Sequence, residues 1–207
     1  RPYASVNESR FLRGAAANFQ NEKIDFTLFG SRKRLDANIS FDDTLNGFDN
    51  SFTSFQISGF HRIPGEIEKQ NTLRETIVGG EFALKGNSYR IGISSVHTSF
   101  DQPLIIDTSG YKKFKFSGSQ LLTTGLNYRF YIRKLTIFGE TAASDNLKFG
   151  TVNGLAWHVD PRLDLLLIYR NYDKSFQSLY STGFGESADN TGERGLYIGA
   201  QARISKK

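Results

Sequence analysis

Residues 122–132, LTTGLNYRFYI, alternate between apolar and small or polar side chains over a length that would cross a bilayer as a tilted strand. One face of this segment carries Leu122, Thr124, Leu126, Tyr128, Phe130 and Ile132. The opposite face carries Thr123, Gly125, Asn127, Arg129 and Tyr131. Because successive side chains of a strand point to opposite faces, this pattern is typical of a wall with lipid on one side and water on the other. Residues 133–134 then lead into LTIFGE, 135–140, which predicts a hairpin.

The same alternation recurs along the chain in strands joined by alternately short and long connections. The predicted strands are residues 10–19, 24–38, 73–84, 88–100, 114–132, 135–143, 149–159, 164–176 and 195–205. The short turns all fall on one side, and they are residues 20–23, 85–87, 133–134 and 160–163. Most long connections fall on the other side, provided that residues 51–60 belong to a large loop and not to a spanning strand. Outer-membrane barrels sort their connections in this way, whereas a soluble meander has no reason to do so.

We therefore predict an all-β protein, an antiparallel transmembrane β-barrel, in which residues 1–207 form a single outer-membrane segment with a long extracellular loop at 40–71. The count of about nine strands is odd, while single-chain bacterial barrels use even numbers and an open sheet edge in lipid is very costly. The chain also ends in ARISKK directly after a strand pattern. These features predict an incomplete segment of a larger barrel. Further strands of the same full-length protein, or another outer-membrane subunit, would complete the wall.

Composition excludes a helical membrane protein. Hydrophobic residues make up 38% of the chain, the mean hydropathy is −0.40, and no apolar run approaches the length of a transmembrane helix. The chain contains no Cys, so disulfides and thiolate metal sites are not available. It contains no Met either, and RPYASVNESR at its start lacks the pattern of a signal peptide, so we expect a processed product or an internal segment.

A net charge of +5 is compatible with nucleic acid, an anionic membrane surface or an acidic glycolipid as partner. No RNA-binding aromatic motif, zinc-finger spacing or basic recognition helix accompanies the charge, so we expect this segment to bind no nucleic acid. The clustered cations are predicted to meet the phosphates of the outer-leaflet glycolipid, and they are Arg32, Lys33, Arg34, Lys112, Lys113 and Lys115. Ordinary solvated charges at strand ends explain the same clusters equally well.

Two further sets of residues follow from the alternation. Aromatic side chains recur close to the short turns, where an aromatic girdle at the inner membrane boundary would lie: Phe19, Tyr89, Phe130, Tyr131 and Trp157. Polar side chains of both signs are predicted to face the lumen: Asp25, Arg90, Asn127, Arg129, Glu140, Gln201 and Arg203. Such a lumen would either conduct or be closed by paired charges, and the pattern does not separate these outcomes.

No catalytic constellation is visible. The three histidines, His61, His97 and His158, lie far apart without metal-ligand spacing, and we expect no metal and no cofactor. The carboxylate pairs lie in polar loop sequence, and no GxSxG motif occurs, so we predict no enzymatic activity. The loop sequence GFHRIPGE is a candidate plug that folds over or into the lumen, through Phe60, His61, Arg62 and Glu66. Structural packing is the simpler role for these residues.

Several segments resemble a family of large outer-membrane proteins of Bacteroidetes-type bacteria, which carry an N-terminal helix-hairpin-helix region before a long barrel. The segments that carry the resemblance are SRFLRGAAA (9–17), SRKRLDANI (31–39), SGFHRIPGEIEK (58–69), RETIVGG (74–80), FSGS (116–119), YRNYDKSFQSLYSTGFGE (169–186) and GLYIGA (195–200). The resemblance implies the middle and later part of such a barrel, without the helix-hairpin-helix region. It implies no activity and no catalytic residues.

The leading hypothesis is a structural or assembly component of an envelope complex in the bacterial outer membrane, in contact with membrane lipid and outer-leaflet glycolipid. The alternative is the wall of a pore or channel for a solute or macromolecule, with the 40–71 loop as plug. A soluble all-β binding module is a third hypothesis, and it differs because it would need no detergent. An outer-membrane phospholipase or protease is the fourth, for which no nucleophile and base are placed.

Overall fold

The computed structural model describes residues 11–41, 50–56, 61–106, 110–180, 183–186 and 191–203. Its contacts divide the chain into two compact units. Unit 1 comprises residues 1–16, 29–79 and 97–121, and unit 2 comprises residues 17–28, 80–96 and 122–207. Several strands pass from one unit into the other, so each unit is described by itself.

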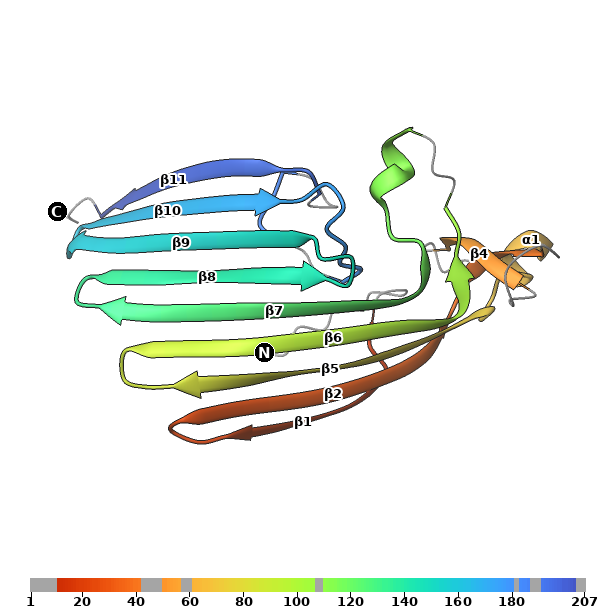
Figure 1. Ribbon diagram of the computed structural model, residues 1–207, viewed down its shortest axis with the longest axis horizontal. Coiled ribbons are helices and arrows are strands. Elements are labelled where there is room, and N and C mark those ends of the chain that lie inside the picture. The colour runs from red at the N-terminus through yellow and green to blue at the C-terminus, as the bar shows by residue number, and fades with distance from the viewer. Residues whose placement is uncertain are drawn as a thin grey trace. The chain divides into compact units, whose positions relative to one another are not determined.

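The protein is all-β, built on a large antiparallel sheet (Figure 1). The strands of the sheet, in spatial order, are β1 (Gly14–Gln20), β2 (Ile24–Leu35), β5 (Leu73–Lys85), β6 (Tyr89–Leu104), β7 (Gly118–Ile132), β8 (Leu135–Ser144), β9 (Phe149–Asp160), β10 (Leu163–Tyr172) and β11 (Arg194–Ala202). This order confirms the predicted antiparallel sheet of about nine strands. Within the described residues the sheet is not closed, and β1 and β11 are its edges. No helix in the described part of the chain is long and apolar enough to cross a membrane.

The hairpin β7–β8 shows how the sequence determines local structure in unit 2. Its register runs from Ile132 opposite Leu135 to Thr123 opposite Ser144, without interruption. Residues 133–134 form the turn, and Arg133 has a φ of 53°. Lys134 has no positive φ, and a positive φ at the first central residue alone is the pattern of a type II′ turn, whose twist matches that of the two strands. The turn predicted from the sequence is therefore present at the predicted residues.

The short turns of unit 2 lie together at one end of its strands. Backbone hydrogen bonds join each turn region to a neighbouring strand or turn. Lys85 N donates to Lys23 O at 2.7 Å, and Tyr131 N donates to Ser88 O at 2.8 Å. His158 N donates to Lys134 O at 2.9 Å, and Arg203 N donates to Arg162 O at 2.8 Å. The connections 145–148 and 173–193 leave unit 2 strands at the opposite end (Figure 1). The four predicted short turns therefore lie at one end of this unit, whereas the short connection 145–148 lies at the opposite end together with 173–193.

Unit 1 contains the elements that depart from the simple meander. Residue Asp36 interrupts the predicted strand 24–38, so that β2 ends at Leu35 and β3 (Ala37–Phe41) pairs with β4 (Asn50–Phe55). Helix α1 (Pro64–Ile67) and the 3₁₀ helix η1 (Gly110–Phe114) occupy the connections. The predicted loop 40–71 therefore contains the strand β4 and a helical turn. β4 lies off the main strand order, and the predicted sorting of turns requires that these residues form no spanning strand.

Aromatic packing holds the β3–β4 hairpin within unit 1. Phe52 is fully buried, and its ring centroid lies 5.2 Å from that of Phe55 and 5.4 Å from that of Phe100. Phe116 extends the cluster, with its ring centroid 6.4 Å from that of Phe100. Offset and edge-on ring pairs of this kind stabilise a core beyond their buried area. One parallel backbone pair, Phe52 with Leu104, connects β4 to β6.

A buried ion pair accompanies this core. Lys33 Nζ lies 3.4 Å from Glu75 Oε2, and each side chain is 1% exposed. Lys33 also donates a 2.6 Å hydrogen bond to the carbonyl oxygen of Phe11, and its ammonium lies 5.3 Å from the centre of the Phe11 ring. Two charges removed from water are stable only when each has a partner in good geometry. Each member of this pair is therefore needed to keep the other stable in the interior of unit 1.

We predict that Glu75→Gln lowers the free energy of unfolding by about 3–5 kcal/mol, because it leaves the Lys33 ammonium buried beside a neutral group. The double variant Lys33→Met with Glu75→Leu should lose less, because it removes both charges. Unfolding in detergent with urea, followed by the fluorescence of the single tryptophan, measures both effects. Arg34→Gln, at an exposed position of the same strand, is the control. Equal stability of Glu75→Gln and the parent protein would show that the pair does not determine stability.

Candidate functional site

The two faces of the sheet in unit 2 differ sharply in chemistry. The register aligns Asn127, Glu140, Val152, Arg170 and Gly195 in one row across β7 to β11. We call the face that carries this row the polar face. The opposite face, here the apolar face, presents Leu28, Phe82, Leu84, Ile91, Ile93, Leu122, Leu126, Leu167, Leu196 and Ile198, all of them exposed. Ile198, for example, is 73% exposed.

An ion-paired network crosses the polar face at its N-terminal strands. Arg90 Nη1 lies 3.0 Å from Glu81 Oε1 and 2.8 Å from Asn127 Oδ1. Arg90 Nη2 lies 3.6 Å from Asp25 Oδ2, and Asn127 donates a 3.0 Å hydrogen bond to Glu81. Asn18 on β1 donates to the other oxygen of Asp25 at 3.0 Å. One guanidinium therefore cross-links side chains from four neighbouring strands, with β1 joined through Asn18.

A second charge cluster surrounds Arg170 on β10. The Arg170 side chain is 8% exposed, and its Nε lies 2.5 Å from Glu193 Oε1, whose side chain is 14% exposed. Its Nη2 lies 2.7 Å from Glu186 Oε1, and that side chain is 86% exposed. The Phe184 ring covers the guanidinium at 5.3 Å, a cation–π arrangement. Glu193 directly precedes β11, and its carbonyl oxygen accepts a 2.8 Å hydrogen bond from Tyr172 N, whereas Glu186 lies farther back in the connection between β10 and β11.

The described parts of that connection, residues 173–180, 183–186 and 191–193, are called the strap here. Gln177 is its central contact, because its N–H donates to Ser144 Oγ at 3.2 Å and its carbonyl oxygen accepts from Thr123 Oγ1 at 3.4 Å. Phe176 is buried and stacks on Tyr172 with ring centroids 6.5 Å apart. By strand alternation and register, Thr123, Ser144 and Tyr172 belong to the polar face, so the strap lies against that face.

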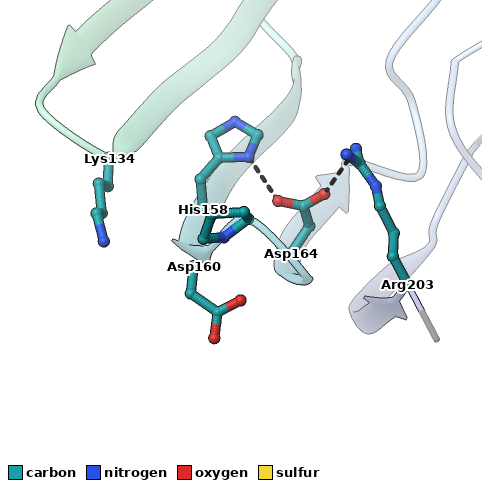
Figure 2. A pocket seen from close by; sticks show the side chains of 6 residues that line it. Lys134, His158, Asp160, Asp164 and Arg203 are labelled. Carbon is teal, nitrogen blue, oxygen red and sulfur yellow. Dashed lines mark hydrogen bonds and ion pairs between the residues drawn. The ribbon is translucent and has the colours of Figure 1, made fainter. Parts of the chain in front are cut away.

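A shallow pocket of about 370 Å³ lies at the short-turn end of unit 2, and Figure 2 shows its lining. Its residues are Lys134, His158, Asp160, Pro161, Asp164 and Arg203. His158 Nδ1 lies 2.6 Å from Asp164 Oδ1, and Arg203 Nη2 lies 3.7 Å from Asp164 Oδ2. In the described part of the chain, no three His, Asp or Glu side chains are grouped to hold a metal ion. The half-buried Asp164 therefore contacts both His158 and Arg203, while Lys134 and Asp160 bond backbone groups of the neighbouring residues Val159 and Arg162.

The structure separates the predicted basic clusters. Arg32 and Arg34 are exposed, whereas Lys33 between them points to the other face of β2 and is buried against Glu75. The prediction that Lys33 contacts glycolipid is therefore wrong, because strand alternation turns it away from its two neighbours. Lys112 and Lys113 lie in η1, and Lys115 follows it, so they precede β7 instead of belonging to it. Contact of the other five with glycolipid stays a prediction.

The predicted girdle residues all lie near the short turns of unit 2. Phe19, Tyr89, Tyr131 and Trp157 are exposed, and Phe130 packs on Tyr128 with ring centroids 5.7 Å apart. Alternation along β7 places Phe130 on the apolar face and Tyr131 on the polar face. Tyr131 therefore lies near the short turns like the other predicted girdle residues, but its side chain is on the polar face, whereas a girdle residue would face lipid.

The predicted lumen-facing residues share the polar face. Asp25, Arg90 and Asn127 belong to the network, and Asn127 is aligned with Glu140. Gln201 is aligned with Asp164, the partner of Arg203. Arg129 is exposed and makes no ion pair with the described residues. The faces were thus predictable from alternation, whereas the pairing partners Glu81 and Asp164 were not identified.

The predicted plug residues belong to unit 1. His61 Nε2 lies 2.7 Å from Asp36 Oδ2, and Asn71 N donates to Asp36 Oδ1 at 2.8 Å. Glu66 Oε2 accepts a 2.8 Å hydrogen bond from Arg62 N, and Phe60 lies outside the described residues. These contacts anchor the segment within unit 1. The segment that lies against the polar face of unit 2 is the strap. Its residues 173–176 belong to the predicted strand 164–176, whereas β10 ends at Tyr172.

Comparison of the chain with protein-family models, with curated proteins and with solved structures found no match.

We predict that Arg90→Met lowers the free energy of unfolding by about 1–3 kcal/mol, because Asp25 and Glu81 then lose the cation that separates their charges. Arg129→Met removes the same charge from the same face without breaking an ion pair among the described residues, and it should change stability little. Urea unfolding of both variants in detergent measures the difference. Equal losses would mean that the network is not a cross-link.

Proposed function

We propose that this chain forms part of the wall of a β-barrel in a bacterial outer membrane, as a structural component of an envelope complex without enzymatic activity. The observation that carries the proposal is the two-faced sheet of unit 2. A row of exposed Leu, Ile and Phe on one face would be unfavourable in water, since apolar area is most stable away from it. Lipid would cover that face, while water and paired charges would occupy the other.

Strand length and aromatic placement support lipid as the covering medium. β7 has 15 residues and β9 has 12, which exceeds the roughly 9–11 residues that a tilted transmembrane strand needs. Phe19, Tyr89, Phe130 and Trp157 lie near the short turns, where a membrane boundary would fall. The resemblance to large Bacteroidetes-type outer-membrane proteins agrees with this assignment.

The edges of the sheet support the need for additional strands. β1, GAAANFQ, has no charge and no proline, and β11, RGLYIGAQA, has a single charge at its first residue. Soluble proteins protect such edges with lysine, proline or bulges, because unpaired backbone groups recruit other strands. In lipid the same groups must be paired. We therefore propose that further β-strands pair with β1 and β11.

Strand direction restricts what those partners are. In an antiparallel order of nine strands the first and the last run in the same direction, so β1 and β11 are parallel to each other. A barrel closed by antiparallel pairs alone has an even number of strands, so closure of these nine needs an odd number of additional strands. A second copy of this chain, inserted with the same orientation, would offer only parallel pairs at both edges. The proposed partner is thus a different strand segment, from the same full-length protein or from another subunit.

Cysteine scanning tests the membrane assignment, because the chain contains no native Cys. We expect an environment-sensitive fluorophore at Leu122→Cys and Leu126→Cys to emit at short wavelength and to be quenched by nitroxide lipids. At Arg129→Cys and Tyr131→Cys, exposed positions on the polar face, it should respond to a water-soluble quencher instead. The alternation follows from the opposite directions of successive side chains.

The contrary result is equally clear. If all four positions respond to the aqueous quencher alone, and the protein stays monomeric without detergent, the chain is a soluble all-β module and the membrane assignment is wrong.

Intact-mass measurement tests the partner strands. We expect the polypeptide that carries this sequence, purified from native membranes, to be well above 23.3 kDa or to copurify with a different subunit. An assembly made only of copies of the 23.3 kDa chain would contradict the argument from strand direction.

A further inference from the structure

The sheet of unit 1 has a buried face and an exposed face. In β2, Lys33 is buried against Glu75, whereas Arg32 and Arg34 on either side of it are exposed. In β5, Glu75 is 1% exposed, whereas Arg74 beside it is partly exposed. Because successive side chains of a strand point to opposite faces, the three arginines lie on the face away from the buried ion pair. We call this face the outward face of unit 1.

A fourth arginine joins the outward face across the sheet. β1 is the neighbour of β2, and Arg13 directly precedes β1. Arg32 N donates a 2.9 Å hydrogen bond to the carbonyl oxygen of Arg13, so the two residues lie opposite each other. Residues in this relation point to the same face, with their Cβ atoms roughly 4.5–5.5 Å apart.

Arg34 and Arg74 form a similar pair across β2 and β5. The buried ion pair of unit 1 aligns these two neighbouring strands of the antiparallel sheet. The next residue of β2 then lies opposite the preceding residue of β5, and these residues are Arg34 and Arg74. Counted along the strands from the hydrogen bond between Lys85 N and Lys23 O, the register is the same.

The four guanidinium groups have no carboxylate partner among the described residues. Asp101 of β6 accepts a 2.9 Å hydrogen bond from the backbone nitrogen of Arg74, but it forms no ion pair with the side chain. The Arg13 guanidinium lies 5.4 Å from the centre of the Phe11 ring. Arg90 of unit 2, by contrast, is paired with two carboxylates. Like charges that lie opposite each other in a sheet repel, so an anion bound at this face would stabilise the cluster.

Exposed apolar side chains occupy the same alternate positions of the strands as the arginines. Val78 of β5 is 55% exposed and lies four residues after Arg74. Leu28 of β2 is 50% exposed and lies four residues before Arg32. Counted from Ile24, where β2 begins, Arg32 is the ninth residue of the strand. A tilted strand crosses the hydrocarbon in about 9–11 residues, so in the proposed membrane the arginines fall at the boundary away from the short turns, among the headgroups of the outer leaflet.

We propose that the outward face of unit 1 binds the phosphate groups of a phosphorylated glycolipid in the outer leaflet through four arginines: Arg13, Arg32, Arg34 and Arg74. This inference rests on the proposed membrane function and adds a specific lipid partner to it. A guanidinium group binds phosphate through two parallel hydrogen bonds, which suits it to this role better than an ammonium group. The acyl chains of the same lipid lie along the exposed apolar side chains. Arg13 and Arg74 lie outside the clusters predicted from the sequence, because only strand pairing brings them beside the other two.

The experiment adds an acylated diglucosamine glycolipid with two phosphate groups to the protein purified in detergent. Native mass spectrometry measures the fraction of the protein that carries the lipid, and hence the Kd. Arg13→Gln with Arg32→Gln, and Arg34→Gln with Arg74→Gln, should each raise the Kd on the order of tenfold, because each double variant removes charge-assisted hydrogen bonds to phosphate. The same lipid without its phosphates should bind the parent protein more weakly by a similar factor.

The matched control removes two arginines from exposed positions elsewhere, as Arg129→Gln with Arg162→Gln. It changes the net charge by the same amount, so it should leave the Kd unchanged if the four arginines form a site. Phosphatidylglycerol and inorganic phosphate are the comparison ligands, and we expect both to bind more weakly than the glycolipid.

Three results would overturn the proposal. The first is an equal Kd for the parent protein and both arginine double variants, or equal binding of the glycolipid with and without phosphates. The second is an equal loss in the matched control, which would mean general attraction of charge. The third is binding of phosphatidylglycerol or inorganic phosphate as tight as that of the glycolipid, which would mean a general anion site.

Failure of this site and failure of the proposed function are distinguishable. If the lipid-quenching pattern of the cysteine variants holds but the arginine variants bind unchanged, the membrane wall stands without this site. If the quenching pattern itself fails, the proposed function fails as well. Should a double variant not fold, judged by heat-dependent gel mobility, Arg34→Gln alone should still raise the Kd severalfold, and an unchanged Kd would overturn the site.

Discussion

The backbone ladder from β7 to β11 is the interaction on which the arrangement of unit 2 depends. Each ladder aligns residues of neighbouring strands, so one register brings Asn127, Glu140 and Arg170 to the same face. A shift of one residue would move every side chain of a strand to the opposite face, and it would turn charged groups toward the exposed leucines. The two-residue turn at 133–134 helps to prevent that shift, because it leaves no slack between β7 and β8.

Charge is accommodated in three different ways on this framework. Arg90 shares Glu81, Asp25 and Asn127 within partly exposed strands, so its pairing strengthens the sheet directly. Lys33 and Glu75 form a buried pair inside unit 1. Arg170 is paired with Glu193, which directly precedes β11 and whose carbonyl oxygen accepts a hydrogen bond from Tyr172 N, and with the exposed Glu186 of the strap. The Arg170 cluster therefore joins β10, the residue before β11 and the strap.

The contrast between faces and edges links the fold to the proposed function. A soluble sheet with one apolar face packs that face against a second layer, and it protects its edge strands with charges or prolines. Unit 2 presents its apolar face without such a layer among the described residues, and β1 carries no protecting charge. Both features are expected for a strand segment whose neighbours are lipid on one face and further strands at its edges.

The sequence by itself determined the strands, their alternation and their short turns, because period-two patterns and turn residues act locally. It therefore predicted the β7–β8 hairpin, the sorting of turns in unit 2 and the shared face of Asp25, Arg90 and Asn127. Only the tertiary structure decided which groups pair. Lys33 is buried beside Glu75, and Arg170 is held by Glu193, because these partners are distant in sequence or lie in a connection whose path no periodicity records. The local sequence pattern determines on which face of a strand a side chain lies. Which residue that side chain contacts also depends on where the partner's segment runs in space.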